Sequence, residues 1–198
     1  MQEITINDSF GQALARYSKG LGVGLEIGGG TGDGSTQCIK TERLYSFEIH
    51  PDRIGRHGMN LSMRSGGIAI HGLSSDPQRW LNEDQIREFY QTVRTNLNMY
   101  SIEFVLSWLK IDLLNASKYK WESFQLDDQL DFLLLDGGAF SGQSDMAEWL
   151  PRMKKGGIIA MDDINDIKNW DNYQKMNGFT KLLWEDWNVR NGAAIFEL

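Results

Sequence analysis

Seven short apolar segments recur along the 198-residue chain, and they constrain its fold more than any other feature. Most are almost continuously apolar instead of alternating apolar and polar, which is typical of strands buried on both faces of a parallel sheet. Helix-forming stretches lie between them, and this alternation predicts a doubly wound α/β fold. The segments are 21–27, 43–49, 67–71, 131–136, 157–161, 179–184 and 193–197.

The connections between these segments refine the expected architecture. The turn-forming pair Asn191-Gly192 joins the last two segments, so they are expected to be antiparallel neighbours, because a parallel pair needs a longer crossover. We therefore predict a three-layer α/β/α sandwich formed by one domain, 1–198, with a seven-stranded, mostly parallel sheet and an antiparallel last strand. Residues 72–130 are too many for a structureless loop, and they are predicted to form an inserted helical cap. Extra packing or an oligomer contact is the alternative for this insertion.

Charge and composition exclude several classes of protein. The chain has 20 lysine and arginine residues against 27 aspartate and glutamate residues, a formal net charge of −7, which disfavours a nucleic-acid partner. No stretch approaches the roughly 18 consecutive apolar residues of a membrane span. The start of the chain lacks the basic and apolar regions of a secretion signal, and the single cysteine, Cys38, excludes an internal disulfide. A cytoplasmic location is expected.

The strongest local signal is a glycine loop directly after the first predicted strand. Three glycines, Gly28, Gly30 and Gly32, allow the backbone to turn sharply and a ligand to approach without a Cβ in the way. The loop lies at the carboxyl end of its strand, where α/β sheets bind ligands. Glu48 closes the second predicted strand, and a carboxylate there can accept hydrogen bonds from both hydroxyls of a ribose.

The spacing in this loop indicates which nucleotide it suits. The third glycine falls one residue too early for the dinucleotide pattern G-x-G-x-x-G, and Asp33 at the expected helix start would repel a pyrophosphate. Glu26, at the end of the strand, adds a second negative charge. Together they favour a nucleoside with a positive centre and no phosphate, such as S-adenosylmethionine, whose amino group and sulfonium would lie near Glu26. An NAD(P)-dependent oxidoreductase is the alternative enzyme class.

The motif Glu26-x-Gly28-x-Gly30-x-Gly32 followed by Glu48 resembles the first two motifs of class I S-adenosylmethionine-dependent methyltransferases. The resemblance implies S-adenosylmethionine as cofactor. It also implies an adenine contact after the third strand, where Ser74 is the candidate, although a turn capped by its hydroxyl explains that serine equally well.

Three aspartates close the fourth and fifth predicted strands: Asp136, Asp162 and Asp163. If these strands are neighbours, the carboxylates converge, and two charges ~4 Å apart repel by about 4 kcal/mol at an effective dielectric constant of 20. Such a cluster needs a compensating partner, which can be a hard cation, a proton, or donors from substrate and backbone. Oxygen-rich sites suit Mg²⁺ or another divalent cation. Alternatively, Asp162 and Asp163 cap the segment that follows them, and Asp136 accepts hydrogen bonds from loop amides.

The layout of these acids resembles metal-dependent O-methyltransferases, and most closely the macrocin type that acts on sugars. The resemblance implies that Asp136, Asp162 and Asp163 bind the metal and that the first two organise the acceptor, a hydroxyl of a small molecule or sugar. Related N-methyltransferases often carry Asn/Asp-Pro-Pro-Tyr where this chain has Asp-Gly-Gly-Ala, which disfavours base methylation.

One departure from that pattern concerns the general base. Residues 139–141 read Ala-Phe-Ser where such enzymes usually carry a lysine or histidine. His71, at the end of the third predicted strand, is the best histidine candidate for this role. A non-catalytic subunit that binds S-adenosylmethionine is the alternative consistent with a missing base. The aromatic residues of the insertion suit either an acceptor pocket or a homo-oligomer interface.

Overall fold

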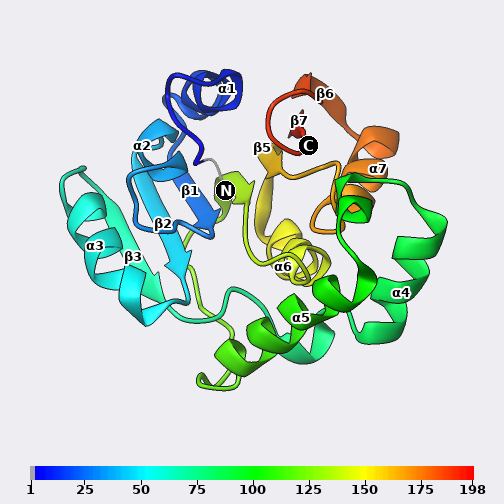
Figure 1. Ribbon diagram of the computed structural model, residues 1–198. Coiled ribbons are helices and arrows are strands. Elements are labelled where there is room, and N and C mark those ends of the chain that lie inside the picture. The colour runs from blue at the N-terminus through cyan, green and yellow to red at the C-terminus, as the bar shows by residue number, and fades with distance from the viewer. Residues whose placement is uncertain (1–2) are drawn as a thin grey trace.

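The strand that leads into the glycine loop, β1 (Val23–Ile27), lies in the interior of a seven-stranded sheet in the computed structural model, which describes residues 3–198 (Figure 1). It pairs in parallel with β2 (Arg43–Glu48) on one side and β4 (Leu130–Leu135) on the other. β3 (Gly67–His71) follows β2, and β5 (Met153–Asp162) follows β4, again in parallel. The order of strands reverses between β1 and β4, and their carboxyl ends there form the expected ligand-binding edge.

The last two strands complete the sheet in the order β3-β2-β1-β4-β5-β7-β6. β7 (Ala193–Glu197) lies between β5 and β6 (Lys181–Asp186) and is antiparallel to both, which confirms the predicted antiparallel last strand. Residues 187–192 connect the two strands and include the predicted turn pair Asn191-Gly192, and β6 lies two residues later than the predicted segment 179–184. Arg190 in this loop has a left-handed φ of 48°.

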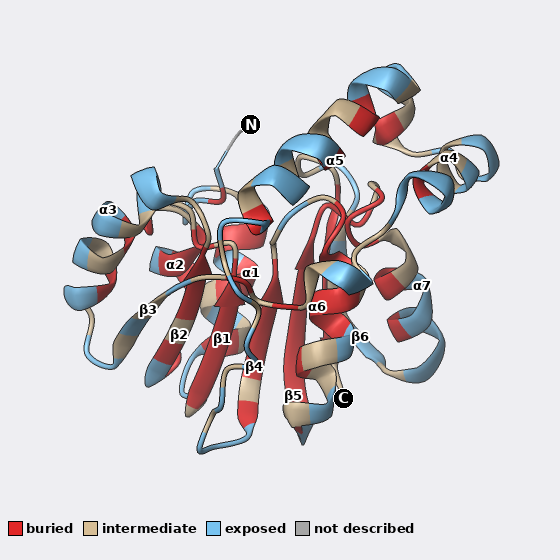
Figure 2. Cartoon of the chain, turned by 90° about the horizontal axis from the view of Figure 1, so that it is seen from below, coloured by how far each residue is buried: buried red, intermediate tan, exposed pale blue. Residues whose placement is uncertain are grey.

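Helices cover both faces of the sheet, which confirms the predicted three-layer sandwich. Alternate strand residues face opposite layers, so Leu25 and Ile27 pack with α6 (Gly142–Trp149) and α7 (Trp170–Phe179). The other face packs against α1 (Ser9–Ser18), α2 (Ser35–Cys38) and α3 (Pro51–Ser62). Figure 2 shows the central strands buried between these layers.

The insertion is helical, as predicted. It contains a short 3-10 turn (Pro77–Arg79), α4 (Glu83–Thr92), a second 3-10 turn (Asn96–Met99) and α5 (Ile102–Ala116). These elements share a small core with Phe140 and Ile167, which follow β4 and β5, so the insertion lies over the carboxyl ends of those strands (Figure 2). Within residues 3–198, no helix combines the length and the apolar character needed to cross a bilayer.

Cys38 provides a test of the packing between α2 and the sheet. Its thiol is fully buried, and burial raises its pKa to about 11. At pH 8 only about one thiol in a thousand would then be a thiolate, the form that reacts with disulfide reagents. We expect Ellman's reagent to label the native chain very slowly and the urea-unfolded chain rapidly, with one thiol per chain. Rapid labelling of the native protein would show that α2 does not pack as described.

Candidate functional site

The glycine loop after β1 has the turn that its sequence predicts, and two glycines have different tasks in it. Gly28 has a φ of 87°, and a Cβ there would lie 2.1 Å from the carbonyl oxygen of Asp136, so only glycine fits against the end of β4. Gly30 has a φ of 59°, but a Cβ there would meet no atom within 4 Å. The backbone at Gly30 therefore lies open to a ligand, whereas Gly28 is required by packing.

Glu26 does not face this open side of the loop. Its carboxylate is fully buried in the layer of α2, where it accepts hydrogen bonds from the hydroxyls of Ser35 (2.5 Å), Thr36 (2.7 Å) and Ser46 (2.5 Å). Both oxygens are engaged, so the predicted contact with the amino group of a ligand is not supported by this geometry. The alternation along β1 explains the difference, because Leu25 and Ile27 occupy the opposite face. Glu26 instead holds the start of α2 against the sheet beneath the loop.

Glu48 lies beside the loop, as predicted. The amides of Gly28 and Gly29 donate to the carbonyl oxygen of Phe47 (3.1 and 3.0 Å), which brings the end of β2 against the glycines. The Oε1 atom of Glu48 accepts a hydrogen bond from the backbone amide of His50 (2.7 Å). Its Oε2 atom has no hydrogen-bonding partner within residues 3–198. The ribose contact stays a prediction, but the carboxylate is held in place with an oxygen free to make it.

The role expected of Asp33 needs correction. The helix begins at Ser35, and its N-cap residue is Gly34, so Asp33 stands before the cap and provides no side-chain cap. Asp33 instead pairs with Arg56 of α3 (2.6 Å) and accepts a hydrogen bond from Thr31. Since Arg56 offsets its charge, Asp33 is a weaker argument against a pyrophosphate than the sequence suggests. The early third glycine carries that argument.

His71 lies far from the aspartates. It ends β3, the edge strand, which is three strand spacings or roughly 14 Å from β4. Its Nε2 atom lies 2.8 Å from the Tyr119 hydroxyl and 3.2 Å from the Ile49 carbonyl oxygen. The structure therefore does not place His71 where a base for an acceptor at Asp136 would stand. Sequence position alone misled here, because strands that end at the same edge need not be neighbours.

Ser74 is engaged by a residue that the sequence analysis missed. Asp145, in the first turn of α6, is fully buried and accepts hydrogen bonds from Ser74 (2.7 Å), Ser75 (2.6 Å) and Ser141 (2.7 Å). The hydroxyl of Ser74 is therefore committed to Asp145, which favours the turn-capping interpretation over a direct adenine contact. Asp145 ties the segment after β3 to the loop after β4. The sequence offered one signal for this role, because Asp145 is an acid at the start of a predicted amphipathic helix, 144–153.

The three predicted aspartates do converge. One carboxylate oxygen from each of Asp136, Asp162 and Asp163 lies within 4.8 Å of the others. Two cations that the sequence analysis did not connect with the cluster meet them there. The ammonium of Lys168 lies 2.8 Å from Asp136 and 2.6 Å from Asp163, and the guanidinium of Arg190 lies 2.9 Å from Asp162. The cluster is thus an ion-pair network of three acids and two bases.

Burial dominates the protonation of this network. Burial raises the pKa of Asp136 to about 8, although the charge of Lys168 opposes the rise. Burial also raises the pKa of Asp162, and the negative charge of Asp163 raises it further. Although burial acts in the same direction on Asp163, Lys168 holds its pKa below the ordinary value. Burial opposes the charge of Lys168, yet the carboxylates of Asp136 and Asp163 keep its pKa well above that of an ordinary lysine. Lys168 is thus a fixed ammonium and does not replace the missing base.

The fit of a divalent metal to this cluster is poor as the side chains stand. Mg²⁺ takes about six oxygen ligands, and Ca²⁺ takes six to eight. Here the ammonium of Lys168 bridges two of the carboxylates, and Asn191 donates to the second oxygen of Asp163 (3.0 Å). The predicted convergence of the acids is confirmed, but their arrangement is that of carboxylates already paired with cations of the protein.

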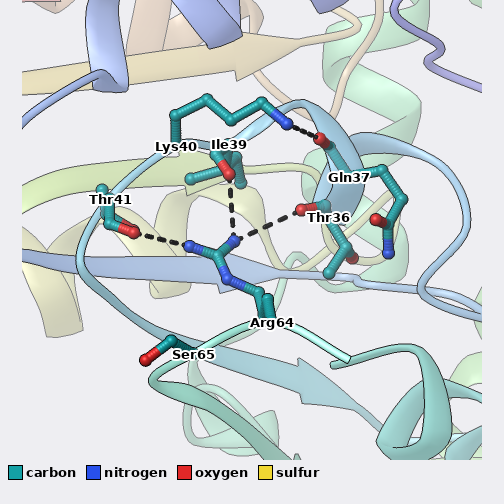
Figure 3. A pocket seen from close by; sticks show the side chains of 7 residues that line it. All are labelled: Thr36, Gln37, Ile39, Lys40, Thr41, Arg64 and Ser65. Atoms are coloured by element: carbon teal, nitrogen blue, oxygen red, sulfur yellow. Dashed lines mark hydrogen bonds between the residues drawn. The ribbon is translucent and has the colours of Figure 1, made fainter. Parts of the chain in front are cut away.

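A hollow of about 260 Å³ lies at the opposite end of the sheet, before the starts of β2 and β3. Figure 3 shows Arg64 within it, donating hydrogen bonds to the carbonyl oxygens of Thr36, Ile39 and Thr41. These bonds satisfy carbonyls at the end of α2, where helices leave backbone groups unpaired. Arg64 is therefore committed to the protein's own backbone, and the residues that line the hollow do not include the glycines of the loop.

Solved structures with the same arrangement of elements include methyltransferases of several kinds. An O-methyltransferase from Bacillus cereus in complex with SAH has a TM-score of 0.55 at 13% identity, covering 97% of this chain and 81% of that chain. The N-methyltransferase NodS from Bradyrhizobium japonicum WM9 has a TM-score of 0.54 at 12% identity, covering 95% of this chain and 93% of that chain. An rRNA methylase from Streptococcus thermophilus has a TM-score of 0.54 at 13% identity, with the same coverage. The chain has a methyltransferase fold.

The methyltransferase fold does not identify an acceptor, because the three similar structures are an O-methyltransferase, an N-methyltransferase and an rRNA methylase. No family model and no curated protein matches the sequence. What distinguishes this chain within the fold must therefore come from its own side chains.

Proposed function

We propose that the chain is an S-adenosylmethionine-dependent methyltransferase that acts on a hydroxyl group of a small molecule or sugar. One combination carries the proposal: β1 and β2 are adjacent strands of a methyltransferase fold, and beyond their carboxyl ends the backbone at Gly30 lies open and one oxygen of Glu48 is uncommitted. The open backbone fits the methionine part of the cofactor, and the carboxylate fits the ribose hydroxyls. The early third glycine supports this nucleoside over a dinucleotide.

The residues around the loop have different roles in binding the cofactor. When bound, S-adenosylmethionine supplies an activated methyl group, whose transfer to an acceptor oxygen releases S-adenosylhomocysteine and a proton. Glu48 holds the ribose, and the backbone at Gly30 approaches the methionine part. Glu26 acts from below by keeping α2 against β1. Since the cofactor carries the reactive group, the task of the chain is to align the acceptor and exclude water.

Asp136 is best placed to meet the acceptor. Its side chain is 19% exposed, whereas those of Asp162 and Asp163 are 7% and 9% exposed. Lys168 engages Oδ1 of Asp136, which leaves Oδ2 free to form a hydrogen bond with an acceptor hydroxyl. Asp112 of α5 lies near the loop that follows Asp136, because a Cβ on Gly138 would lie 3.8 Å from its Oδ2 atom. These acidic groups and a net charge of −7 favour a small polar acceptor over a nucleic acid.

The ribose assignment makes a binding prediction. Glu48→Ala removes an acceptor of charge-assisted hydrogen bonds, each worth about 1.5–3 kcal/mol, so the dissociation constant for S-adenosylhomocysteine should rise roughly tenfold to a hundredfold. Isothermal titration calorimetry measures it. Glu42→Ala is the matched control, because Glu42 is exposed and precedes the same strand at its opposite end. A Glu48→Ala affinity within about twofold of wild type contradicts the assignment.

Turnover separates this proposal from a non-catalytic role. A catalytic chain should transfer the methyl group of S-adenosylmethionine to at least one sugar or small-molecule hydroxyl, and it should release S-adenosylhomocysteine in equal amount. A chain that binds S-adenosylhomocysteine but turns over no acceptor in a broad hydroxyl panel would instead support the cofactor-binding subunit.

A further inference from the structure

The aspartate cluster contains a cation of the chain itself. We propose that Lys168 occupies the place of a divalent metal between Asp136 and Asp163, so that the cluster excludes such a metal and positions Asp136 without one. Lys168 is a positioning residue in this scheme. The inference goes beyond methyl transfer, because it concerns how the acids are neutralised and would hold whatever ligand the glycine loop binds.

The position of the ammonium is the first support. Its Nζ atom lies 2.8 Å from Oδ1 of Asp136 and 2.6 Å from Oδ2 of Asp163, so it bridges acids that follow different strands. The side chain of Lys168 is 8% exposed. A metal held by the same two oxygens would need this space, and a buried ammonium and a divalent cation would repel each other strongly there.

Most of the carboxylate oxygens in the cluster are engaged by the protein itself. Arg190 engages Oδ1 of Asp162, and Asn191 engages Oδ1 of Asp163, so four of the six oxygens in the cluster have partners in the chain. The two uncommitted oxygens, on Asp136 and Asp162, would leave a metal to take most of its roughly six ligands from water. They are instead available to hydrogen-bond donors.

The backbone that carries Lys168 is held in place beside the cluster. Asn169 donates to the carbonyl oxygens of Leu135 (3.0 Å) and Asp162 (2.8 Å), which ties the loop to the ends of β4 and β5. On the other side, a Cβ on Gly142 would lie 2.0 Å from the Lys168 carbonyl oxygen, so the start of α6 packs directly on this residue. A shift of this backbone would require the strand ends and α6 to separate, so the loop presents Lys168 to the acids from a fixed position.

The test uses Mn²⁺ as the probe and the full chain as the sample. Free Mn²⁺ is followed by electron paramagnetic resonance, and thermal unfolding is measured with Mn²⁺ and with EDTA. The wild-type chain is expected to bind no stoichiometric Mn²⁺ and to keep the same melting temperature in both conditions. Lys168→Ala uncovers the acids, so it should bind about one Mn²⁺ per chain and melt at a higher temperature with Mn²⁺ than with EDTA.

Lys154→Ala is the matched control, because Lys154 also pairs with an aspartate, Asp131 (2.7 Å), but at an exposed place outside the cluster. It should gain no Mn²⁺ site. Stoichiometric Mn²⁺ binding by the wild type overturns the proposal, and so does a folded Lys168→Ala variant that binds none. If Lys168→Ala does not fold, the double variant Lys168→Met/Asp163→Asn tests it, because removing one charge of each sign should restore stability relative to Lys168→Met. No restoration also overturns it.

These outcomes are separate from those of the proposed function. Binding of S-adenosylhomocysteine to the glycine loop is measured on the same samples, and its failure would leave the Mn²⁺ result unchanged. Conversely, a metal-binding wild type would overturn the role of Lys168 while leaving the cofactor site intact.

Discussion

Gly28→Ala is expected to destabilise the chain by about 3 kcal/mol or more, whereas Gly30→Ala should lose only about 1–2 kcal/mol. Both glycines have left-handed φ values, so both substitutions carry the same conformational strain. Only at Gly28 does the new Cβ meet backbone, the Asp136 carbonyl oxygen at 2.1 Å, which forces the loop and the end of β4 apart. Urea unfolding followed by circular dichroism measures the difference.

The direct effect on ligand binding is expected at Gly30 and not at Gly28. A Cβ at Gly30 projects into open space at the loop, where we place the methionine part of the cofactor, so Gly30→Ala should weaken S-adenosylhomocysteine binding while the chain stays folded. Equal losses of stability in both variants would show that strain, not the contact with β4, sets the requirement at Gly28. Unchanged affinity in Gly30→Ala would place the ligand elsewhere.

Asp145→Ala is the second large expected effect, a loss on the order of 3 kcal/mol in the free energy of unfolding. The substitution leaves the hydroxyls of Ser74 and Ser75 without an acceptor, while Ser141 keeps the Gly138 carbonyl oxygen (3.2 Å), and unsatisfied buried polar groups cost about 1–3 kcal/mol each. Asp171→Ala is the control, because Asp171 accepts a side-chain hydrogen bond only from Gln143 among the described residues. It should lose roughly 1 kcal/mol, and a loss equal to that of Asp145→Ala would contradict the network.

The same residue should make stability depend on pH. Burial raises the pKa of Asp145, although the three serine hydroxyls oppose the rise. A carboxyl group with a higher pKa in the folded chain holds its proton to higher pH than in the unfolded chain, so its contribution to stability falls as pH rises above about 4. Urea unfolding over a pH series should show this decline in the wild type, with a shallower slope in Asp145→Asn. Identical slopes would show that Asp145 carries no raised pKa.

The parts of the site that sequence patterns predicted are those fixed by local chemistry. Continuous apolar segments are stable only inside a covered sheet, and a glycine loop after such a segment lies at its carboxyl edge. Asp136 and Asp162 converge because each stands at the end of a strand, and those strands are adjacent. The orientation of Glu26 could also have been predicted from the sequence, since side chains alternate along a strand and Glu26 lies between Leu25 and Ile27, so it faces the opposite layer.

The parts that sequence patterns missed depend on the crossovers between strands. His71 ends a strand at the correct edge, but the order β3-β2-β1-β4 separates it from the acids. Lys168 lies 32 residues from Asp136, and Arg190 lies 28 residues from Asp162, at separations where no periodicity links the partners. The sequence alone determined that acids would gather beside a glycine loop. Only the tertiary structure decided which cations neutralise them, because burial makes an unpaired charge so costly that the partner comes from whichever loop folds back onto the strand ends.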